Sequence, residues 1–359
     1  MDQKRENGTF RALYLLAILF VVDGHDPLPD LFDLGGLMAY YSFHMMLFAF
    51  GSGYFFRLHG GAGRDLAHRA RRLLVPLYAY NLLYGLLGAA LRRFAGFRFG
   101  APISAYTLLL APLVDGEHFS WNLGAWYIFP LFLTQVFYAG LSRVLRRGRF
   151  PLCLALGVAA FSLHARLGLP LFLFRPLALL PAYAAGAAYR AHWEARDTLP
   201  DLPFFAGLIA LRGALLLLFG RLSYLLSSGT FVDCGAIGVY ASAATGIALW
   251  LRVARRIAPA VEQSRLALAV SRRTLPILMH HYVGFAALNF LFLMAHLLGL
   301  APDFHVGALR ASVAFVYAPG EKAAFALLYL LFGVGVSLLL ALLTERLLAL
   351  LRRGLHIRA

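Results

Sequence analysis

The sequence predicts an all-α integral membrane protein with about ten transmembrane helices. Its 359 residues are 61% hydrophobic and only 14% charged, with a mean hydropathy of +0.72, whereas soluble domains are about 25% charged. We therefore expect one transmembrane domain over residues 1–359 and no appended soluble domain. The apolar runs of spanning length lie at 9–26, 37–56, 73–91, 124–142, 150–166, 174–190, 203–220, 235–252, 274–298 and 321–346.

The distribution of basic residues predicts the topology. If the ten runs alternate across the bilayer, 24 of the 33 Lys and Arg fall on the side that holds both termini, eight fall on the other side, and Arg212 lies inside the seventh run. The positive-inside rule then places both termini in the cytoplasm. The net charge of +16 is spread over these short clusters, so we expect membrane lipids and no nucleic acid as partners.

The first apolar stretch, FRALYLLAILFVVDGHDPLP over residues 10–29, carries His25 between Asp23 and Asp26 in what we expect to be its last helical turn. Ionisable groups in a span are costly and are functional candidates by default. A neutral imidazole can act as a general base at neutral pH. Because Asp26 precedes Pro27, its backbone is biased out of the helix, which could turn its carboxylate onto the ring. The alternative is a helix-end histidine among lipid headgroups.

One face of this stretch forms a long stripe. Arg11, Tyr14, Ile18, Val21 and His25 recur at steps of three and four residues, which places them on one side of a helix. At 1.5 Å per residue, Arg11 and His25 are roughly 21 Å apart. This spacing suits a long substrate that extends along the helix.

Three further clusters are candidates. His44 lies in the second run, ahead of Gly51, Ser52 and Gly53, whose small size allows close helix packing or ligand approach. HRARRLLVP places Arg69, Arg71 and Arg72 at the start of the third run, where guanidinium groups could bind phosphates or simply follow the positive-inside rule. His280 and His281 are adjacent in the ninth run, without the i, i+4 spacing of a helical metal pair, so we expect no metal site.

Five motifs occur in an order that resembles a known family. They are VVDGHDP, SFHMMLFAFGSGYFFR, HRARRLLVP, WNLGAWYIFPLFL and RRTLPILMHHYV. Together they resemble the acyltransferase type 3 family of multi-pass bacterial membrane enzymes, and most closely its fucose-4-O-acetylase-like members. The resemblance implies a ten-helix core in the bacterial inner membrane. This core would transfer an acyl group, usually acetyl, from cytoplasmic acyl-CoA to a hydroxyl of an envelope glycan, a lipid-linked sugar or a small molecule.

The resemblance also implies roles for individual residues. His25 corresponds to the essential histidine of the family. From its position before Pro27, and not from the resemblance, we also expect Asp26 to take part in catalysis. The family usually has a basic residue eleven positions before that histidine; here Tyr14 stands there, and Arg11 lies one turn earlier. Met46 stands where proline is common. We expect acyl-CoA to contact Arg11, Tyr14, Arg69, Arg71 and Arg72, and the substrate to contact His44, Ser52, Tyr54, Asn122, Trp126, His280 and His281.

A second hypothesis is a proton-coupled transporter or flippase for a glycan or lipid, with the histidines in a proton relay. Transporters commonly contain internal repeats and paired interrupted spans, and we find neither in the sequence. The acceptor, the acyl chain length, direct or covalent transfer through His25, and the oligomeric state are left open by the sequence.

Overall fold

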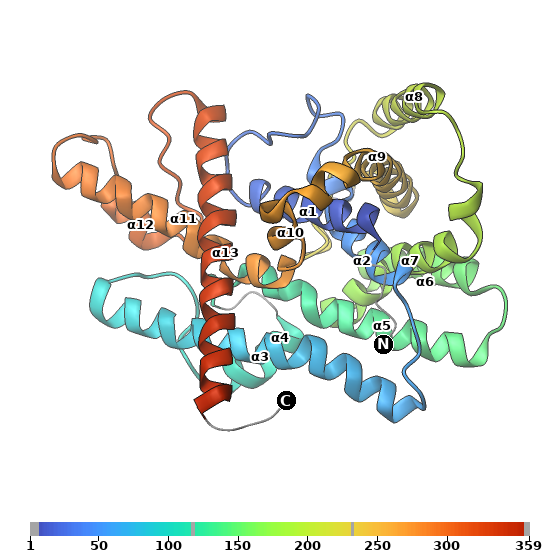
Figure 1. Ribbon diagram of the computed structural model, residues 1–359, viewed down its shortest axis with the longest axis horizontal. Helices are drawn as coiled ribbons and strands as arrows, with labels where there is room; N and C mark the ends of the chain where they lie inside the picture. Colours follow the sequence, from blue (N-terminus) through green and yellow to red (C-terminus); the bar gives the residue numbers. More distant parts are fainter. Residues whose placement is uncertain (1–6, 116–118, 231–232, 355–359) are drawn as a thin grey trace.

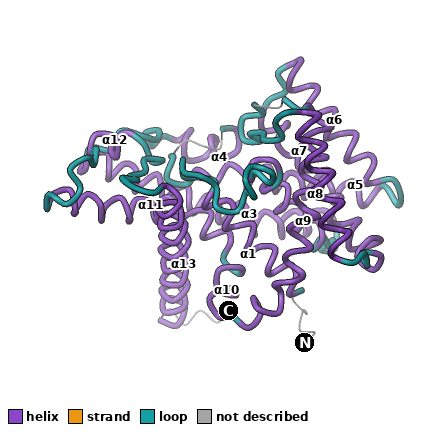
Figure 2. The backbone as a smooth tube through the Cα atoms, turned by 90° about the horizontal axis from the view of Figure 1, so that it is seen from above, coloured by secondary structure: helices purple, strands orange, loops and turns teal. Residues whose placement is uncertain are grey.

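The structure is a computed structural model that describes residues 7–115, 119–230 and 233–354. All regular secondary structure in the described residues is helical, apart from one isolated bridge between Leu225 and Thr230, and no strand is drawn in Figure 2. The α-helices are α1 (Gly8–Asp23), α2 (His44–Tyr54), α3 (Ala62–Ala95), α4 (Ala111–Val114), α5 (Ile128–Val144), α6 (Arg149–Leu167), α7 (Leu171–Ala188), α8 (Asp201–Phe219), α9 (Gly235–Gln263), α10 (Arg265–Ser271), α11 (Thr274–Leu297), α12 (Val306–Ala311) and α13 (Lys322–Gly354). Short 3-10 or π turns are η1 (Tyr40–Ser42), η2 (Tyr106–Leu110), η3 (Leu123–Tyr127), η4 (Tyr189–Trp193) and η5 (Glu194–Arg196).

The all-α fold class is confirmed, and each of the ten apolar runs corresponds to a helix. Eight helices in the described residues are long and apolar enough to cross a membrane. The other two, α1 with 16 residues and α2 with 11, are shorter. The protein is therefore a multi-pass membrane protein with eight to ten candidate spans. Residues 1–6 and 355–359 lie outside the described residues, and the cytoplasmic location of both termini stays a prediction.

The first helix ends earlier than the sequence predicts. α1 stops at Asp23, and His25 lies in the turn that follows it rather than in its last helical turn. The amides of Gly24 and His25 donate to the carbonyls of Phe20 and Val22 and close this end of the helix. The Asp26-Pro27 pair resists the helical conformation, which explains the early stop.

The second run is helical only in its C-terminal half. α2 begins at His44, and the preceding residues form turns and the short η1 instead of the helix expected from residue 37. Irregular backbone at membrane depth is stable only where protein covers it, and Tyr40, Ser42 and Phe43 are all buried. The positive φ of Leu34, Gly35 and Gly36 reverses the chain before this segment.

Arg212 of α8 binds this irregular segment. Its guanidinium donates to the carbonyls of Leu37 and Ser242, at 2.8 and 2.7 Å, and to the hydroxyls of Ser42 and Thr245. Its side chain is fully buried, so this cation inside the seventh apolar run is paired within the protein and does not extend to the membrane surface. Arg212 is the one buried residue of α8, and the helix lies at the periphery in Figure 1.

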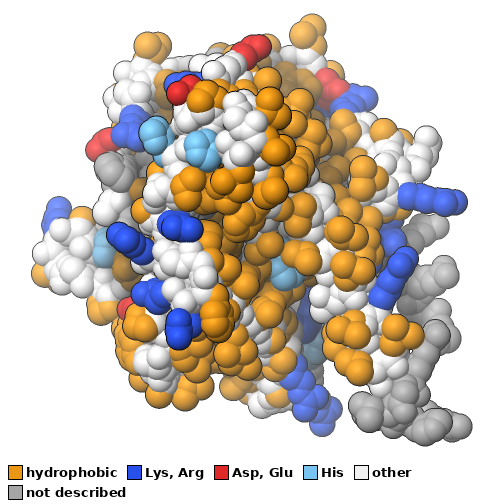
Figure 3. Space-filling model, turned by 90° about the vertical axis from the view of Figure 1, so that its left-hand side faces the viewer, with side chains coloured by type: hydrophobic (Ala, Val, Ile, Leu, Met, Phe, Trp, Pro, Cys, Tyr) orange, Lys and Arg blue, Asp and Glu red, His pale blue; other side chains and the backbone are white. Residues whose placement is uncertain are grey.

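α1 and α2 lie in the middle of the molecule (Figure 1). α1 packs against α2, α9, α10, α11 and α13, and α2 packs against α7. The α2–α7 contact is made backbone to backbone, since a Cβ on Gly53 would lie 1.8 Å from the carbonyl oxygen of Tyr183. Gly51 faces a side chain instead, since a Cβ on it would lie 2.8 Å from the hydroxyl oxygen of Tyr14. Hydrophobic side chains cover much of the outer face seen in Figure 3, as contact with lipid requires.

Candidate active site

His25 is oriented by the helix that precedes it. Its Nδ1 lies 2.5 Å from the carbonyl oxygen of Val21, one turn back. A carbonyl oxygen can only accept a hydrogen bond, so Nδ1 carries the proton of the neutral ring and Nε2 keeps its lone pair. The ring therefore offers an unprotonated nitrogen on the side that faces away from α1.

His44 is held in the same way at the start of α2. Its Nδ1 lies 2.6 Å from the carbonyl oxygen of Tyr40, and its ring packs edge-on against Tyr41 at 5.1 Å. The hydroxyl of Tyr41 donates to the carbonyl of Gly24 at 2.6 Å. This bond ties the turn that carries His25 to the segment that carries His44.

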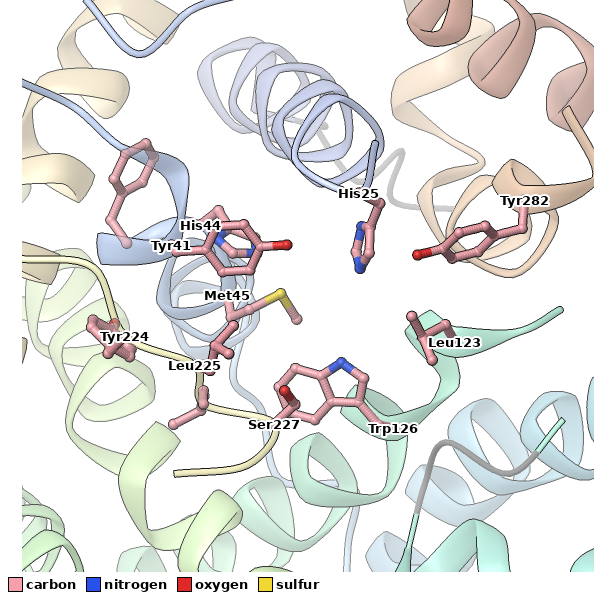
Figure 4. A pocket seen from close by; sticks show the side chains of 12 residues that line it. His25, Tyr41, His44, Met45, Leu123, Trp126, Tyr224, Leu225, Ser227 and Tyr282 are labelled. Carbon is pink, nitrogen blue, oxygen red and sulfur yellow. The ribbon is translucent and has the colours of Figure 1, made fainter. Parts of the chain in front are cut away.

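These two histidines line one cavity of about 240 Å³. Figure 4 shows the ring of His25 pointing into it and the hydroxyl of Tyr282 pointing toward that ring. The ring centroids of His25 and Tyr282 are 5.8 Å apart. The remaining wall is mostly apolar or aromatic, which is typical of a small-molecule site with a few polar groups. The lining residues are His25, Tyr41, Phe43, His44, Met45, Leu123, Trp126, Tyr224, Leu225, Leu226, Ser227 and Tyr282.

The histidine pair of α11 divides between two environments. His281 is fully buried, and its ring centroid lies 4.9 Å from that of His25. Its Nδ1 bonds the carbonyl of Leu278 at 2.8 Å, while Nε2 has no hydrogen-bond partner among the described residues. His280 points instead to α3, where its Nδ1 lies 2.5 Å from the hydroxyl of Tyr84. The structure thus brings His281 to His25 and leaves His280 in a helix contact.

The carboxylate of Asp26 does not contact His25 in the way the sequence suggests. Its Oδ1 accepts from the amide of Leu28 at 2.9 Å, a local turn typical of aspartate, and the carbonyl of Val21 orients the ring instead. Asp23 has the more connected position. It accepts from the hydroxyl of Tyr40 at 2.6 Å and from the amide of Leu31 at 2.8 Å.

Trp126 is the other predicted substrate residue that lines the cavity. The guanidinium carbon of Arg175 lies over its ring, 5.4 Å from the ring centroid. The guanidinium of Arg175 also donates to the carbonyl of Ser227 through Nε at 2.7 Å, and so holds the loop that carries Ser227 at the cavity. Asn122 is buried just ahead of the lining residue Leu123, and its Nδ2 has no partner among the described residues.

Sequence reasoning missed the aromatic and loop residues of this cavity. Tyr282 directly follows His281 and Tyr41 lies three residues before His44, and this proximity is the signal in the sequence that could have singled them out. Tyr224 and Ser227 belong to a short loop without any motif, and they reach the site through the bond from the amide of Tyr224 to the carbonyl of Tyr41, at 3.1 Å.

The other residues expected at the substrate lie toward the opposite end of α2. Tyr54, the last residue of α2, donates to Glu194 and accepts from the Nδ2 of Asn7 at 2.9 Å. Asn7 caps the start of α1. Ser52 lies two residues before Tyr54, beside Gly51 and its contact with Tyr14. Neither Ser52 nor Tyr54 lines the cavity of His25.

The basic residues expected to hold the donor differ in availability. Arg69 is buried and bonded to Asp65 at 3.0 Å, to Gln135 at 3.2 Å and to the carbonyl of Arg57 at 2.9 Å. This network occupies its guanidinium, so Arg69 fits a structural role rather than phosphate binding. Arg71 and Arg72 are exposed. Arg11 lies 3.8 Å from Glu262.

Comparisons with known proteins support a single assignment. No curated protein and no solved structure shows significant similarity to the chain. The family described as "Acyltransferase domain" matches residues 11–346, which include every helix from α2 to α12 and most of α1 and α13. The chain therefore belongs to the acyltransferase 3 family, and it is a multi-pass membrane acyltransferase.

Proposed function

We propose that this acyltransferase moves an acetyl or similar acyl group from cytoplasmic acyl-CoA to a hydroxyl of an envelope glycan, a lipid-linked sugar or a small molecule, in the bacterial inner membrane. The observation that supports the proposal best is the orientation of His25. Its Nδ1 is engaged by the carbonyl of Val21, and the ring faces a cavity of about 240 Å³. A general base needs this combination of fixed tautomer and access.

In the direct route, Nε2 of His25 takes the proton of the acceptor hydroxyl. The acceptor oxygen attacks the thioester carbonyl carbon, the carbon–sulfur bond breaks, and the thiol of CoA leaves with the proton. In the covalent route, Nε2 attacks the thioester carbonyl carbon, the carbon–sulfur bond breaks, and CoA leaves as its thiolate. The acceptor oxygen then attacks the acyl carbon, the bond to Nε2 breaks, and the hydroxyl proton ends on the CoA thiolate. Both routes use the same unprotonated nitrogen, which His25 supplies.

The cavity wall supports an acceptor that carries hydroxyl groups. Trp126 offers an apolar ring, and the hydroxyls of Tyr41, Ser227 and Tyr282 offer hydrogen-bond partners around it. A few converging polar groups on an aromatic wall provide orientation for a small ligand. A sugar ring presents both an apolar face and several hydroxyls, so it fits this wall well.

The proposed route of the donor follows α1 and α2. Because α1 has 16 residues, it is about 24 Å long at 1.5 Å per residue. His25 lies beyond one end, and Asn7 with Tyr54 marks the other. With the topology predicted from the basic residues, His25 is near the outer face, so an extended donor from the cytoplasm would reach it along these helices.

The second candidate is a proton-coupled transporter or flippase, with His25, His44 and His281 as a proton relay. The close approach of His25 and His281, 4.9 Å between ring centroids, is the observation that favours it. A transporter would move its substrate into vesicles without forming a covalent product. Membership of an acyltransferase family makes the enzyme the stronger candidate.

The test uses purified full-length protein in nanodiscs with acetyl-CoA that carries a labelled acetyl group, and an envelope fraction of the expression host as acceptor. We expect labelled product, and about 10²–10⁴-fold less of it with His25→Ala. The matched control is His296→Ala, since His296 also bonds a carbonyl through Nδ1, at 2.7 Å, but does not line the cavity. Equal transfer by His25→Ala and wild type would contradict the assignment.

A further inference from the structure

A second cavity, of about 370 Å³, lies at the end of α2 remote from His44. Its position follows from Tyr54, the last residue of α2, which lines it and also bonds Asn7 at the start of α1. The eleven residues of α2 span about 15 Å and separate this cavity from that of His25. The lining residues are Gly53, Tyr54, Phe56, Arg57, Tyr138, Arg149, Ala187, Arg190 and Ala191.

Three arginines from separate elements converge on this cavity. Arg57 follows α2, Arg149 is the first residue of α6, and Arg190 follows α7. The lining contains no carboxylate. Arg57 and Arg190 are exposed and Arg149 is half-buried, so their guanidinium groups remain in contact with solvent at the mouth of the cavity. Three positive charges without a countercharge in the wall favour an anionic ligand.

Aromatic side chains form part of the wall and help to place the charges. The guanidinium of Arg190 donates to the carbonyl of Tyr54 at 3.2 Å. Its central carbon also lies over the Tyr54 ring, 5.5 Å from the ring centroid. The nearby carboxylate of Glu194 accepts from the hydroxyl of Tyr54 at 2.8 Å. The ring of Tyr138 packs edge-on against that of Phe56, with 4.8 Å between the ring centroids. Guanidinium groups are suited to phosphate, because their planar donors can bind two oxygens at once.

We propose that this cavity, defined by Arg57, Arg149 and Arg190, binds the phosphate groups of a phosphorylated nucleotide. Under the proposed function, on which this identification rests, that nucleotide is the adenosine bisphosphate end of the acyl-CoA. The arrangement explains how the donor can be held although Arg69 is occupied by Asp65. An anionic lipid headgroup carries the same phosphate chemistry, and the experiment separates the two sources.

The experiment measures binding of adenosine 3′,5′-bisphosphate by calorimetry to the full-length protein in nanodiscs of neutral phosphatidylcholine. We expect wild type to bind and Arg57→Gln/Arg149→Gln/Arg190→Gln to bind about tenfold or more weakly. The matched control removes three exposed arginines that do not line the cavity, Arg64, Arg146 and Arg147, with the same substitution. If the first triple variant does not fold, Arg57→Gln/Arg149→Gln replaces it, because it keeps the bond between Arg190 and Tyr54.

A second arm measures the thermal unfolding of wild type and variant in the neutral nanodiscs and in nanodiscs that contain phosphatidylglycerol. If this lipid raises the unfolding temperature of wild type only, and the bisphosphate does not bind, a lipid headgroup occupies the cavity and the nucleotide assignment is wrong. Equal bisphosphate binding by wild type and the triple variant also overturns it. Normal His25-dependent transfer by the triple variant would refute this inference alone, whereas arginine-dependent bisphosphate binding without any transfer would refute only the proposed function.

Discussion

The hydroxyl of Tyr40 donates a 2.6 Å hydrogen bond to the carboxylate of Asp23 and so joins the end of α1 to the segment that precedes α2. The backbone carbonyl of Tyr40 also accepts from Nδ1 of His44. One residue therefore connects the turn that carries His25 with the second histidine of the cavity.

Tyr40→Phe should lower both stability and transfer. The change leaves the buried carboxylate of Asp23 without its hydroxyl donor, which costs about 1–3 kcal/mol. Tyr106→Phe is the control, because it removes an exposed hydroxyl that also bonds a carboxylate, that of Asp115. Thermal unfolding in detergent and the labelled-acetyl assay measure the two effects, and equal unfolding temperatures for both variants would contradict the prediction.

Gly53→Ala should destabilise the protein by about 1–3 kcal/mol. The new Cβ would lie 1.8 Å from the carbonyl oxygen of Tyr183, so α2 and α7 would have to separate. Gly207→Ala on α8 has open space around the added methyl group and should be neutral or stabilising by up to about 1 kcal/mol. Unfolding temperatures of the pair measure the difference; a stable Gly53→Ala protein would argue against the close contact.

Arg212→Lys should destabilise the protein although the charge is kept. The single ammonium group cannot reach the carbonyls of Leu37 and Ser242 together with Ser42, and each buried acceptor left unpaired costs about 1–3 kcal/mol. Because Leu37 and Ser42 flank the turn that leads to His44, we also expect a higher KM for the acceptor. The exposed Arg146→Lys is the control, and an unchanged unfolding temperature for Arg212→Lys would refute the role.

His280 and His281 should differ in their effects on transfer. His281→Ala removes a ring that packs 4.9 Å from His25, and the loosened base should lower kcat by about 10–100-fold. His280→Ala removes the bond to Tyr84 and should cost about 1 kcal/mol of stability with little effect on kcat. Steady-state kinetics with unfolding curves separate the two effects, and an equal loss of kcat in both variants would contradict the division.

The pH dependence of stability should include Asp197, in the loop before α8. Burial alone would raise the pKa of this carboxyl, but the hydrogen bond from Tyr189 and the charges of Arg255 and Arg252 outweigh it and hold the pKa below its usual value. A lowered folded-state pKa contributes stability above about pH 4, which is lost as the pH falls through the folded-state pKa. Asp197→Asn should therefore lower the unfolding temperature at pH 7 and match wild type in strong acid, with exposed Asp303→Asn as the control.

Local patterns accounted for most of the fold. Ten apolar runs correspond to ten helices, since the need to bury apolar side chains in lipid acts on each segment by itself. The exceptions are the ends beside the site. α1 stops before His25, where the Asp26-Pro27 pair resists the helical conformation, and α2 starts only at His44. Tertiary hydrogen bonds from Tyr41 and Arg212 pair two carbonyls of the non-helical backbone between them, those of Gly24 and Leu37.

The sequence by itself determined a helical membrane protein of the acyltransferase 3 family and singled out His25. Only the tertiary structure decided which neighbours serve that histidine. His281 rather than His280 faces it, Val21 rather than Asp26 orients it, and Arg69 is occupied by Asp65 while other arginines line an open cavity. The physical reason is the distance along the chain over which each effect acts. Hydrophobic periodicity and charge patterns determine the structure of a single segment, whereas the meeting of side chains at a site depends on how helices far apart in the sequence pack together.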